Sequence, residues 1–171
     1  MSQKNKKKEP GFKFIKTSGG IEEYHLESNN LRILTLEDHS APVATFMVTY
    51  HVGSRNEAIG YTGATHLLEH LMFKGSKKFN KEKNTAIWSE LQNIGAQINA
   101  TTWNDRTNYF EVVPSEHLER AIAIEADRMR HAFLKDEDRQ PEMTVVRNEF
   151  ERGENSPFDV LDKNIWATAY Q

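Results

Sequence analysis

Two histidines and a glutamate lie within one short apolar stretch, GATHLLEHLMFKGS, at residues 63–76. The leucines and the methionine around them recur at helical spacing, which predicts a helix over residues 63–75 with Gly75 at its end. Because residues four apart lie on one helix face, His66 and His70 can direct their imidazoles at a common centre. Paired histidines at this spacing hold zinc in helical metal sites, so both are candidate ligands.

Glu69 lies beside this pair, where its carboxylate could reach a water on the metal without binding the metal itself. Zinc lowers the pKa of such a water toward ~7, and a neighbouring carboxylate can accept the proton as the water attacks a carbonyl. The alternative is that the two histidines are ordinary surface or core residues. Because the chain contains no cysteine, a zinc site would also need an aspartate or glutamate from elsewhere in the fold.

Strands are expected both before and after this helix in the sequence. The stretches LRILTLED at 31–38 and VATFMVTYHVG at 43–53 are rich in β-branched and aromatic residues, and HSAP joins them. After the helix, residues 96–103 and 107–114 alternate in polarity around NDR, a pattern typical of a β-hairpin. The sequence therefore predicts at least four strands, two of them in a hairpin.

Further helices are expected over residues 83–95, from Ser115 to about Phe133, from Pro141 onward, and over residues 158–171. In the second of these, the helical spacing predicts an inward face made of Leu118, Ala121, Ile122, Ala126 and Met129. This order of elements favours an α+β fold, with a mainly antiparallel sheet and helices packed on one side.

Composition narrows the function further. The chain of 171 residues has a net charge of −3 and 27% charged residues, which gives no footprint for nucleic acid. No apolar stretch approaches the ~18 residues that a membrane span needs, and no secretory signal is recognisable, so a cytoplasmic location is expected. Residues 1–15, which include the run KNKKK, are interpreted as a polar, lysine-rich tail. No phosphate-binding glycine loop occurs, so nucleotides are not expected as ligands.

The stretch HLLEH resembles the inverted zinc motif HxxEH of the pitrilysin-type metallopeptidases, the inverzincins. The family includes insulin-degrading enzyme and the mitochondrial processing peptidases. The surroundings are similar too: VGSRNE stands before the motif, GAQINATTWNDRTNYFEVVP after it, and EMTVVRNEFERGENSP further along. The resemblance covers residues from about Asn30 to the end.

This resemblance implies a function as well as a fold. By position, Glu149 would be the third ligand of one Zn²⁺ per chain. Glu142, two helical turns earlier, would orient the ligands or the water. Asn99 and Ala100 match positions that bind a peptide substrate, which adds as an extended strand along a sheet edge. The expected activity is that of a zinc-dependent endopeptidase, with Glu69 as its general base.

The resemblance also implies partners and alternatives. Residues 16–171 would form the N-terminal metallopeptidase domain, truncated at its C-terminal end, and a homologous second half or subunit would complete a chamber around the peptide. A second copy of the chain could cover the same surface, and no membrane partner is expected. S-ribosylhomocysteine lyase also carries HxxEH, but it needs cysteines that this chain lacks. A non-catalytic binding or structural subunit of the same fold stays open as the alternative.

Overall fold

The computed structural model of the chain describes residues 10–170. It divides into two compact units, Met1–Pro42 and Val43–Gln171. The candidate site residues all belong to the second unit, so the first is described briefly.

The first unit is a three-stranded antiparallel sheet in the order β1-β2-β3. Its strands are β1 (Phe12–Ser18), β2 (Ile21–Leu26) and β3 (Arg32–Thr35). The polar tail expected over residues 1–15 is wrong from Phe12 onward, because β1 begins there; residues 1–9 lie outside the described part. The sequence of β1 is FKFIKTS, in which the alternation of apolar residues and lysines is interrupted at Phe14 and Ile15. Such a short and irregular strand pattern does not stand out beside the lysine run.

The second unit contains a sheet in the order β4-β6-β5, antiparallel throughout. Its strands are β4 (Val43–Tyr50), β5 (Gln97–Thr102) and β6 (Thr107–Pro114). The hairpin expected after the helix is confirmed as β5 and β6. The strands expected at 31–38 and 43–53 exist in shorter form, but they do not pair: β3 joins β2, and β4 joins β6.

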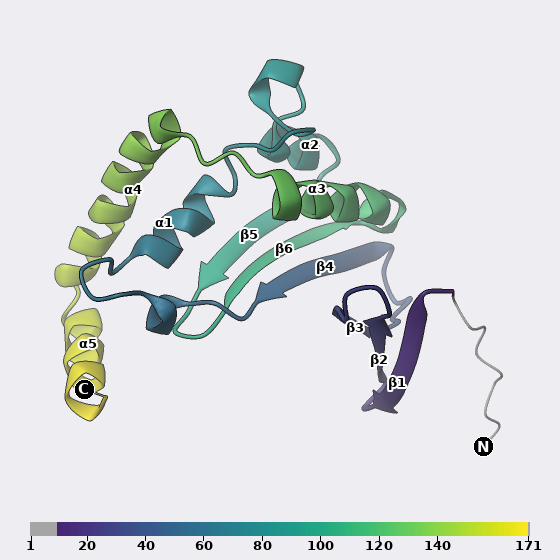
Figure 1. The fold of residues 1–171 in the computed structure, drawn as a ribbon, viewed down its shortest axis with the longest axis horizontal. Coiled ribbons are helices and arrows are strands. Elements are labelled where there is room, and N and C mark those ends of the chain that lie inside the picture. Colours follow the sequence, from purple (N-terminus) through teal and green to yellow (C-terminus); the bar gives the residue numbers. More distant parts are fainter. Residues whose placement is uncertain (1–9, 171) are drawn as a thin grey trace. The chain divides into compact units, whose positions relative to one another are not determined.

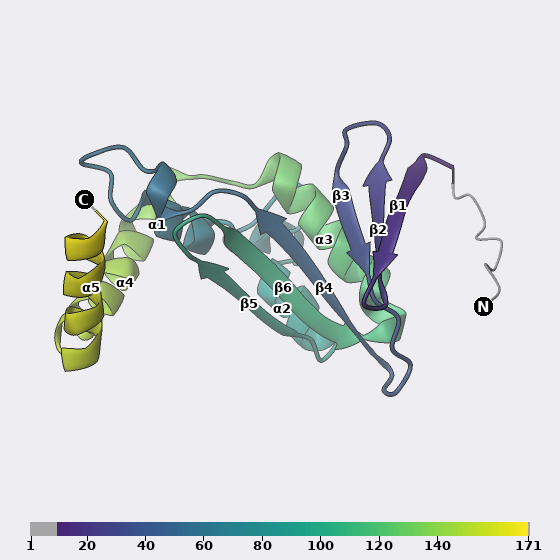
Figure 2. The ribbon, with the colours of Figure 1, turned by 90° about the horizontal axis from the view of Figure 1, so that it is seen from below.

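Helices cover one face of the β4-β6-β5 sheet, as Figures 1 and 2 show together. Along β6 every second side chain is buried, which is the alternation of a sheet covered on one face. The antiparallel sheets and one-sided helices confirm the predicted α+β fold. The helices and short 3₁₀ turns of this unit are η1 (Ser54–Asn56), α1 (Ala64–Leu71), η2 (Lys81–Lys83), α2 (Ile87–Asn93), η3 (Ser115–His117), α3 (Leu118–His131), α4 (Asp136–Glu154) and α5 (Pro157–Ala169).

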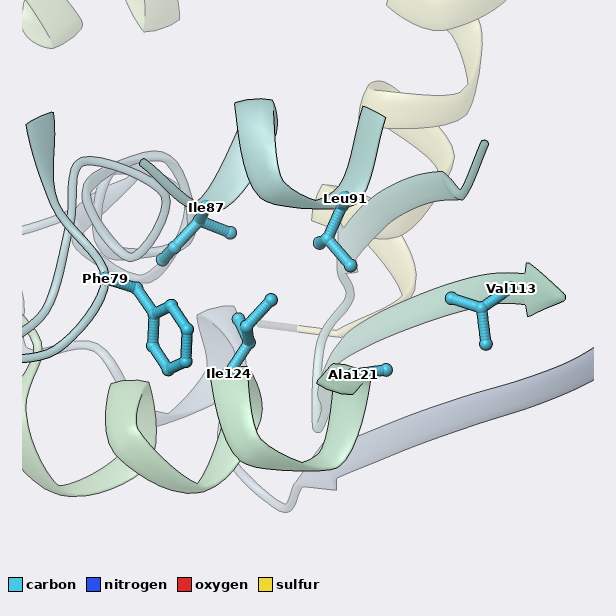
Figure 3. Packing of buried hydrophobic residues seen from close by; sticks show 6 residues of the cluster. All are labelled: Phe79, Ile87, Leu91, Val113, Ala121 and Ile124. Atoms are coloured by element: carbon cyan, nitrogen blue, oxygen red, sulfur yellow. The ribbon is translucent and has the colours of Figure 1, made fainter. Parts of the chain in front are cut away.

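The apolar core lies between this sheet and α2 and α3. Figure 3 shows its buried side chains converging from the two helices, from β6 and from the loop before α2. These residues are Phe79, Ile87, Leu91, Val113, Ala121 and Ile124. The core therefore fixes the sheet against the helices that cover it. The candidate site lies beside one of the helices of this unit, α1.

The buried face of α3 differs from the predicted one. Its buried residues include Glu125 and Arg128, whereas several of the apolar residues expected inside are exposed. The Arg128 guanidinium lies over the rings of Phe73 and Tyr109, at 4.8 and 4.3 Å from their centroids, and donates to the Glu125 carboxylate. Ring faces and a carboxylate thus stabilise a charge that helical spacing alone assigns to the solvent side. The residues wrongly expected inside are Ile122, Ala126 and Met129.

The helix expected from Pro141 onward begins earlier, at Asp136. Its first turn carries Asp136, Glu137 and Asp138, and acidic side chains there stabilise the positive end of the helix dipole. Pro141 therefore lies inside α4. No helix of the described part is long and apolar enough to cross a membrane.

Candidate metal centre

The candidate centre is built on α1, the helix that carries the HxxEH motif. Gly63 stands at its N-terminal boundary with a φ of 91°, a left-handed conformation that favours glycine. The helix ends at Leu71, before the Gly75 end that the sequence predicted, because the chain turns through residues 72–74. The helix α1 contacts both α4 and β5 (Figure 1), so groups from three elements can meet beside it.

Three side chains converge at this point. His66 Nε2 lies 3.2 Å from His70 Nε2. The carboxylate oxygen Oε2 of Glu149, on α4, lies 3.5 Å from His66 Nε2 and 3.6 Å from His70 Nε2. The structure thus brings the two histidines of the motif together with a glutamate that is distant in sequence.

These separations fit a tetrahedral zinc ion. Zinc bonds to imidazole nitrogen and carboxylate oxygen are roughly 2.0–2.2 Å long, and at a tetrahedral angle they place neighbouring ligand atoms roughly 3.3–3.6 Å apart. Among the described residues, His66, His70 and Glu149 form the one group of three or more with this potential. Two neutral nitrogens and one carboxylate are also a donor set that zinc accepts while keeping a position for water.

Glu142 does not join the three ligand atoms but contacts the opposite edge of one ligand. Its Oε2 lies 3.1 Å from His70 Nδ1, and Lys74 donates to its other oxygen. Burial acts to raise the pKa of Glu142, but Lys74 and His70 outweigh it and hold the pKa below its ordinary value. An ionised carboxylate at Nδ1 fixes the ring so that Nε2 faces the metal position.

Glu69 is buried at 8% exposure and accepts a hydrogen bond from the Thr102 hydroxyl of β5. Glu69, His66 and Ala100 line the same cavity, which has a volume of about 690 Å³. A carboxylate held in this way, beside the histidines and facing a cavity, has the placement that a general base needs.

The two residues expected to bind peptide lie on β5, which pairs with β6 on one side only among the described residues. Ala100 is buried at the cavity, whereas Asn99 is exposed and its side-chain oxygen accepts a hydrogen bond from the Ala100 amide. The structure thus places Ala100 beside Glu69 and His66 but does not bring Asn99 into that cavity.

Several residues of this site were missed by sequence reasoning. Lys74 lies four residues after His70, at a helical spacing that could have drawn attention to it. Thr102 is part of the quoted hairpin motif, but only the fold brings it to Glu69. Glu57, in VGSRNE, accepts hydrogen bonds from the amides of Gly63 and Thr65 at 2.9 and 2.8 Å.

Residues 32–171 match the family described as Insulinase (Peptidase family M16). The chain belongs to this peptidase family. The predicted membership among the pitrilysin-type metallopeptidases is therefore confirmed.

Relatives of the M16 chain carry different names. It is 34% identical over 143 residues to "Cytochrome b-c1 complex subunit 1, mitochondrial" of Bos taurus, covering 84% of this chain and 29% of that protein. It is 33% identical over 144 residues to "Zinc protease PqqE" of Helicobacter pylori, covering 83% of this chain and 32% of that protein. The crystal structure of pitrilysin superposes with a TM-score of 0.72 at 25% identity, over 83% of this chain and 16% of that one. The chain thus spans less than a third of these proteins.

Proposed function

We propose that the chain carries the zinc-binding region of a metalloendopeptidase, with His66, His70 and Glu149 as the ligands of one Zn²⁺. The observation that carries this proposal is the convergence of three ligand atoms at 3.2, 3.5 and 3.6 Å, the spacing of a tetrahedral zinc site. Family membership supports it, since M16 relatives include proteins named zinc proteases.

When bound, zinc supplies a Lewis acid that activates water and polarises a carbonyl. Glu69 faces the cavity beside His66, where it can accept the proton of an attacking water. The same proton can pass to the amine nitrogen as the carbon–nitrogen bond of the peptide breaks. Glu142 holds the ring of His70 in register through Nδ1, and the Thr102 hydroxyl holds the carboxylate of Glu69.

The substrate we propose is a peptide in extended form. Strand β5 has one unpaired edge among the described residues, and the small side chain of Ala100 lets a peptide backbone lie close to Glu69. A homologous second half or subunit would complete the substrate chamber, because the chain spans about 29% of one of its M16 relatives. Cleavage is therefore expected of the longer protein that contains this region.

Zinc analysis of the purified chain tests the metal assignment. We expect about one zinc per chain in the wild type and in Glu69→Gln, because Glu69 is outside the ligand set. His66→Ala and Glu149→Gln should lose the metal, whereas Glu151→Gln, a change of an exposed glutamate on the same helix, should keep it. Equal zinc in His66→Ala and the wild type would contradict the proposal.

Peptide cleavage by the longer protein tests the role of Glu69. Glu69→Gln should lower kcat by orders of magnitude while zinc content stays the same, because the proton acceptor is lost and the ligands are not.

The second candidate function is a structural subunit of the same fold, favoured by the relative that is named as a subunit of the cytochrome b-c1 complex. Zinc-free protein prepared without chelators would favour that candidate.

A further inference from the structure

The start of α1 has a capping problem, because the residue at its boundary has no side chain. N-terminal caps are ordinarily Ser, Thr, Asp or Asn, whose side chains accept the free amides of the first turn. Those residues take an extended backbone there, whereas Gly63 has a φ of 91° and a ψ of −1°. A side chain at this position would be strained, so the acceptor for the first amides must come from elsewhere.

Glu57 supplies that acceptor from the preceding loop. The Gly63 amide donates to its Oε2 at 2.9 Å, and the Thr65 amide donates to its Oε1 at 2.8 Å. One carboxylate therefore binds two amides at the positive end of the helix, where a negative charge is also favoured by the helix dipole. Burial acts to raise the pKa of Glu57, but these amides outweigh it and hold the pKa below its ordinary value.

Glu57 is itself held in place by the hairpin. The amide of Ser54 donates to the Trp103 carbonyl at 3.0 Å, and the amide of Arg55 donates to the Asn104 carbonyl at 2.9 Å. The chain from 53 to 57 therefore connects the turn between β5 and β6 to the first turn of α1. The site residue in that first turn is His66, the third residue of the helix.

We propose that Glu57 is a positioning residue for the metal centre, which caps α1 and thereby holds His66 where it can bind zinc. The inference rests on the proposed function, since it concerns the affinity of the same zinc site. It assigns to the GSRNE segment the task of fixing one ligand relative to the hairpin. Glu57 lines the same cavity as Glu69 but lies outside the group of three ligand atoms, and its hydrogen bonds act on the backbone of the first turn of α1.

Zinc affinity of the purified chain, measured by competition with a chromogenic chelator, tests this role. Glu57→Ala should weaken zinc binding about tenfold, because the first turn then frays and His66 is less often in place. Glu57→Gln keeps one acceptor oxygen and should fall between Glu57→Ala and the wild type. Thermal unfolding and circular dichroism of each variant establish that it is folded.

Ser156→Ala is the matched control, because it removes a helix cap elsewhere in the chain. The Ser156 hydroxyl accepts the Asp159 amide at the start of α5. Its loss should lower the melting temperature in a similar way but leave zinc affinity within twofold of the wild type. A drop in affinity as large as that of Glu57→Ala would mean a general effect of stability and would overturn the inference.

Two further outcomes separate this inference from the proposed function. If His66→Ala abolishes zinc binding but folded Glu57→Ala and Glu57→Gln both bind zinc like the wild type, the positioning role is wrong and the zinc site stands. If His66→Ala binds zinc as the wild type does, the proposed function fails, and the inference fails with it.

Discussion

At the scale of single residues, the candidate metal centre depends on both ring nitrogens of His70. His70 Nε2 faces His66 and Glu149, while its Nδ1 faces Glu142. A neutral histidine that presents one nitrogen to a metal carries its proton on the other, and an acceptor for that proton fixes the tautomer and the orientation of the ring. The ion pair with Lys74 keeps that acceptor ionised.

Glu142→Ala should therefore weaken zinc binding about 10- to 100-fold without removing a ligand, because the ring of His70 loses its orienting acceptor. Glu142→Gln retains an oxygen that can accept from Nδ1 and should lose less. Chelator competition at neutral pH measures both. Wild-type affinity in Glu142→Ala would show that the contact has no effect on the metal.

A second carboxylate has a role in stability rather than at the centre. Glu111 of β6 is fully buried on the helix-covered face, with Oε1 lying 3.7 Å from Arg128 Nη2. Burial, together with the neighbouring carboxylate of Glu125, raises the pKa of Glu111 to about 9, although the charge of Arg128 acts to lower it. Glu111 is therefore a neutral acid in the folded chain near pH 7.

This shift makes stability depend on pH. The pKa of Glu111 is higher in the folded chain than its ordinary value of 4.5. The contribution of Glu111 to the stability of the folded chain is therefore fully present below about pH 4.5 and is lost as the pH rises toward 9. The free energy of unfolding should decline by at most about 1.4 kcal/mol per pH unit from this group. The side chain of Glu111→Gln stays neutral, so the free energy of unfolding of this variant should change less with pH. The variant should be more stable than the wild type at alkaline pH.

Urea unfolding at about pH 6 and about pH 8.5 measures this difference. Both proteins are measured with a chelator present, so that the histidines at the candidate centre contribute equally. Parallel pH profiles for the wild type and Glu111→Gln would show that Glu111 does not hold its proton in the folded state.

At the scale of elements, the centre needs α1, α4 and the β5–β6 hairpin at fixed separations. Helix α1 carries two proposed ligands, α4 carries the third, and β5 carries the hydroxyl that binds Glu69.

The loop before α1 contacts the hairpin where Gly53 approaches the turn between β5 and β6. A Cβ at Gly53 would lie 2.1 Å from the Trp103 carbonyl oxygen, a contact that real side chains do not make.

Gly53→Ala should therefore destabilise the chain by roughly 1–3 kcal/mol, because the loop or the hairpin turn must move. Gly153→Ala is the matched control within α4, where the nearest atom to a new Cβ is the Asp159 carboxylate oxygen at 3.8 Å. It should stabilise the chain by about 0.5–1 kcal/mol, since alanine favours the helix. Melting temperatures that fall equally in both would contradict the assigned contact.

At the scale of the whole molecule, a stripe of apolar side chains on α5 is exposed. Its members recur at helical spacing on one face, and Phe158 is 83% exposed. Such contiguous apolar surface is typical of an interface. The α5 stripe consists of Phe158, Leu161, Ile165 and Trp166.

The purified chain is therefore expected to associate with a second copy through the α5 stripe, as an apolar surface is removed from water by pairing. Phe158→Asp should shift the chain toward monomer in sedimentation velocity at matched concentrations. Leu134→Asp changes an exposed apolar residue that lies outside α5 and lines no pocket with it, and should have little effect. Equal association of Phe158→Asp and the wild type would rule out this surface.

The sequence by itself predicted much of the local structure. The hairpin, the motif helix and the α+β class follow from alternation and helical spacing, which depend on neighbours along the chain. The family resemblance pointed to Glu149 and Glu142, although no spacing in the chain relates them to His66. The inward face of α3 was wrong because spacing ranks residues by hydropathy, and Arg128 is stabilised by rings that belong to other elements.

Helical spacing in the sequence predicts that His66 and His70 share one helix face. It predicts nothing further about the metal site. Only the tertiary structure decided that the Glu149 oxygen lies within 3.6 Å of both imidazoles, that Thr102 binds Glu69, and that Glu57 caps α1. The physical reason is that ligand distances depend on how helices and strands pack. Packing is set by contacts between residues far apart along the chain, which spacing along the sequence does not encode.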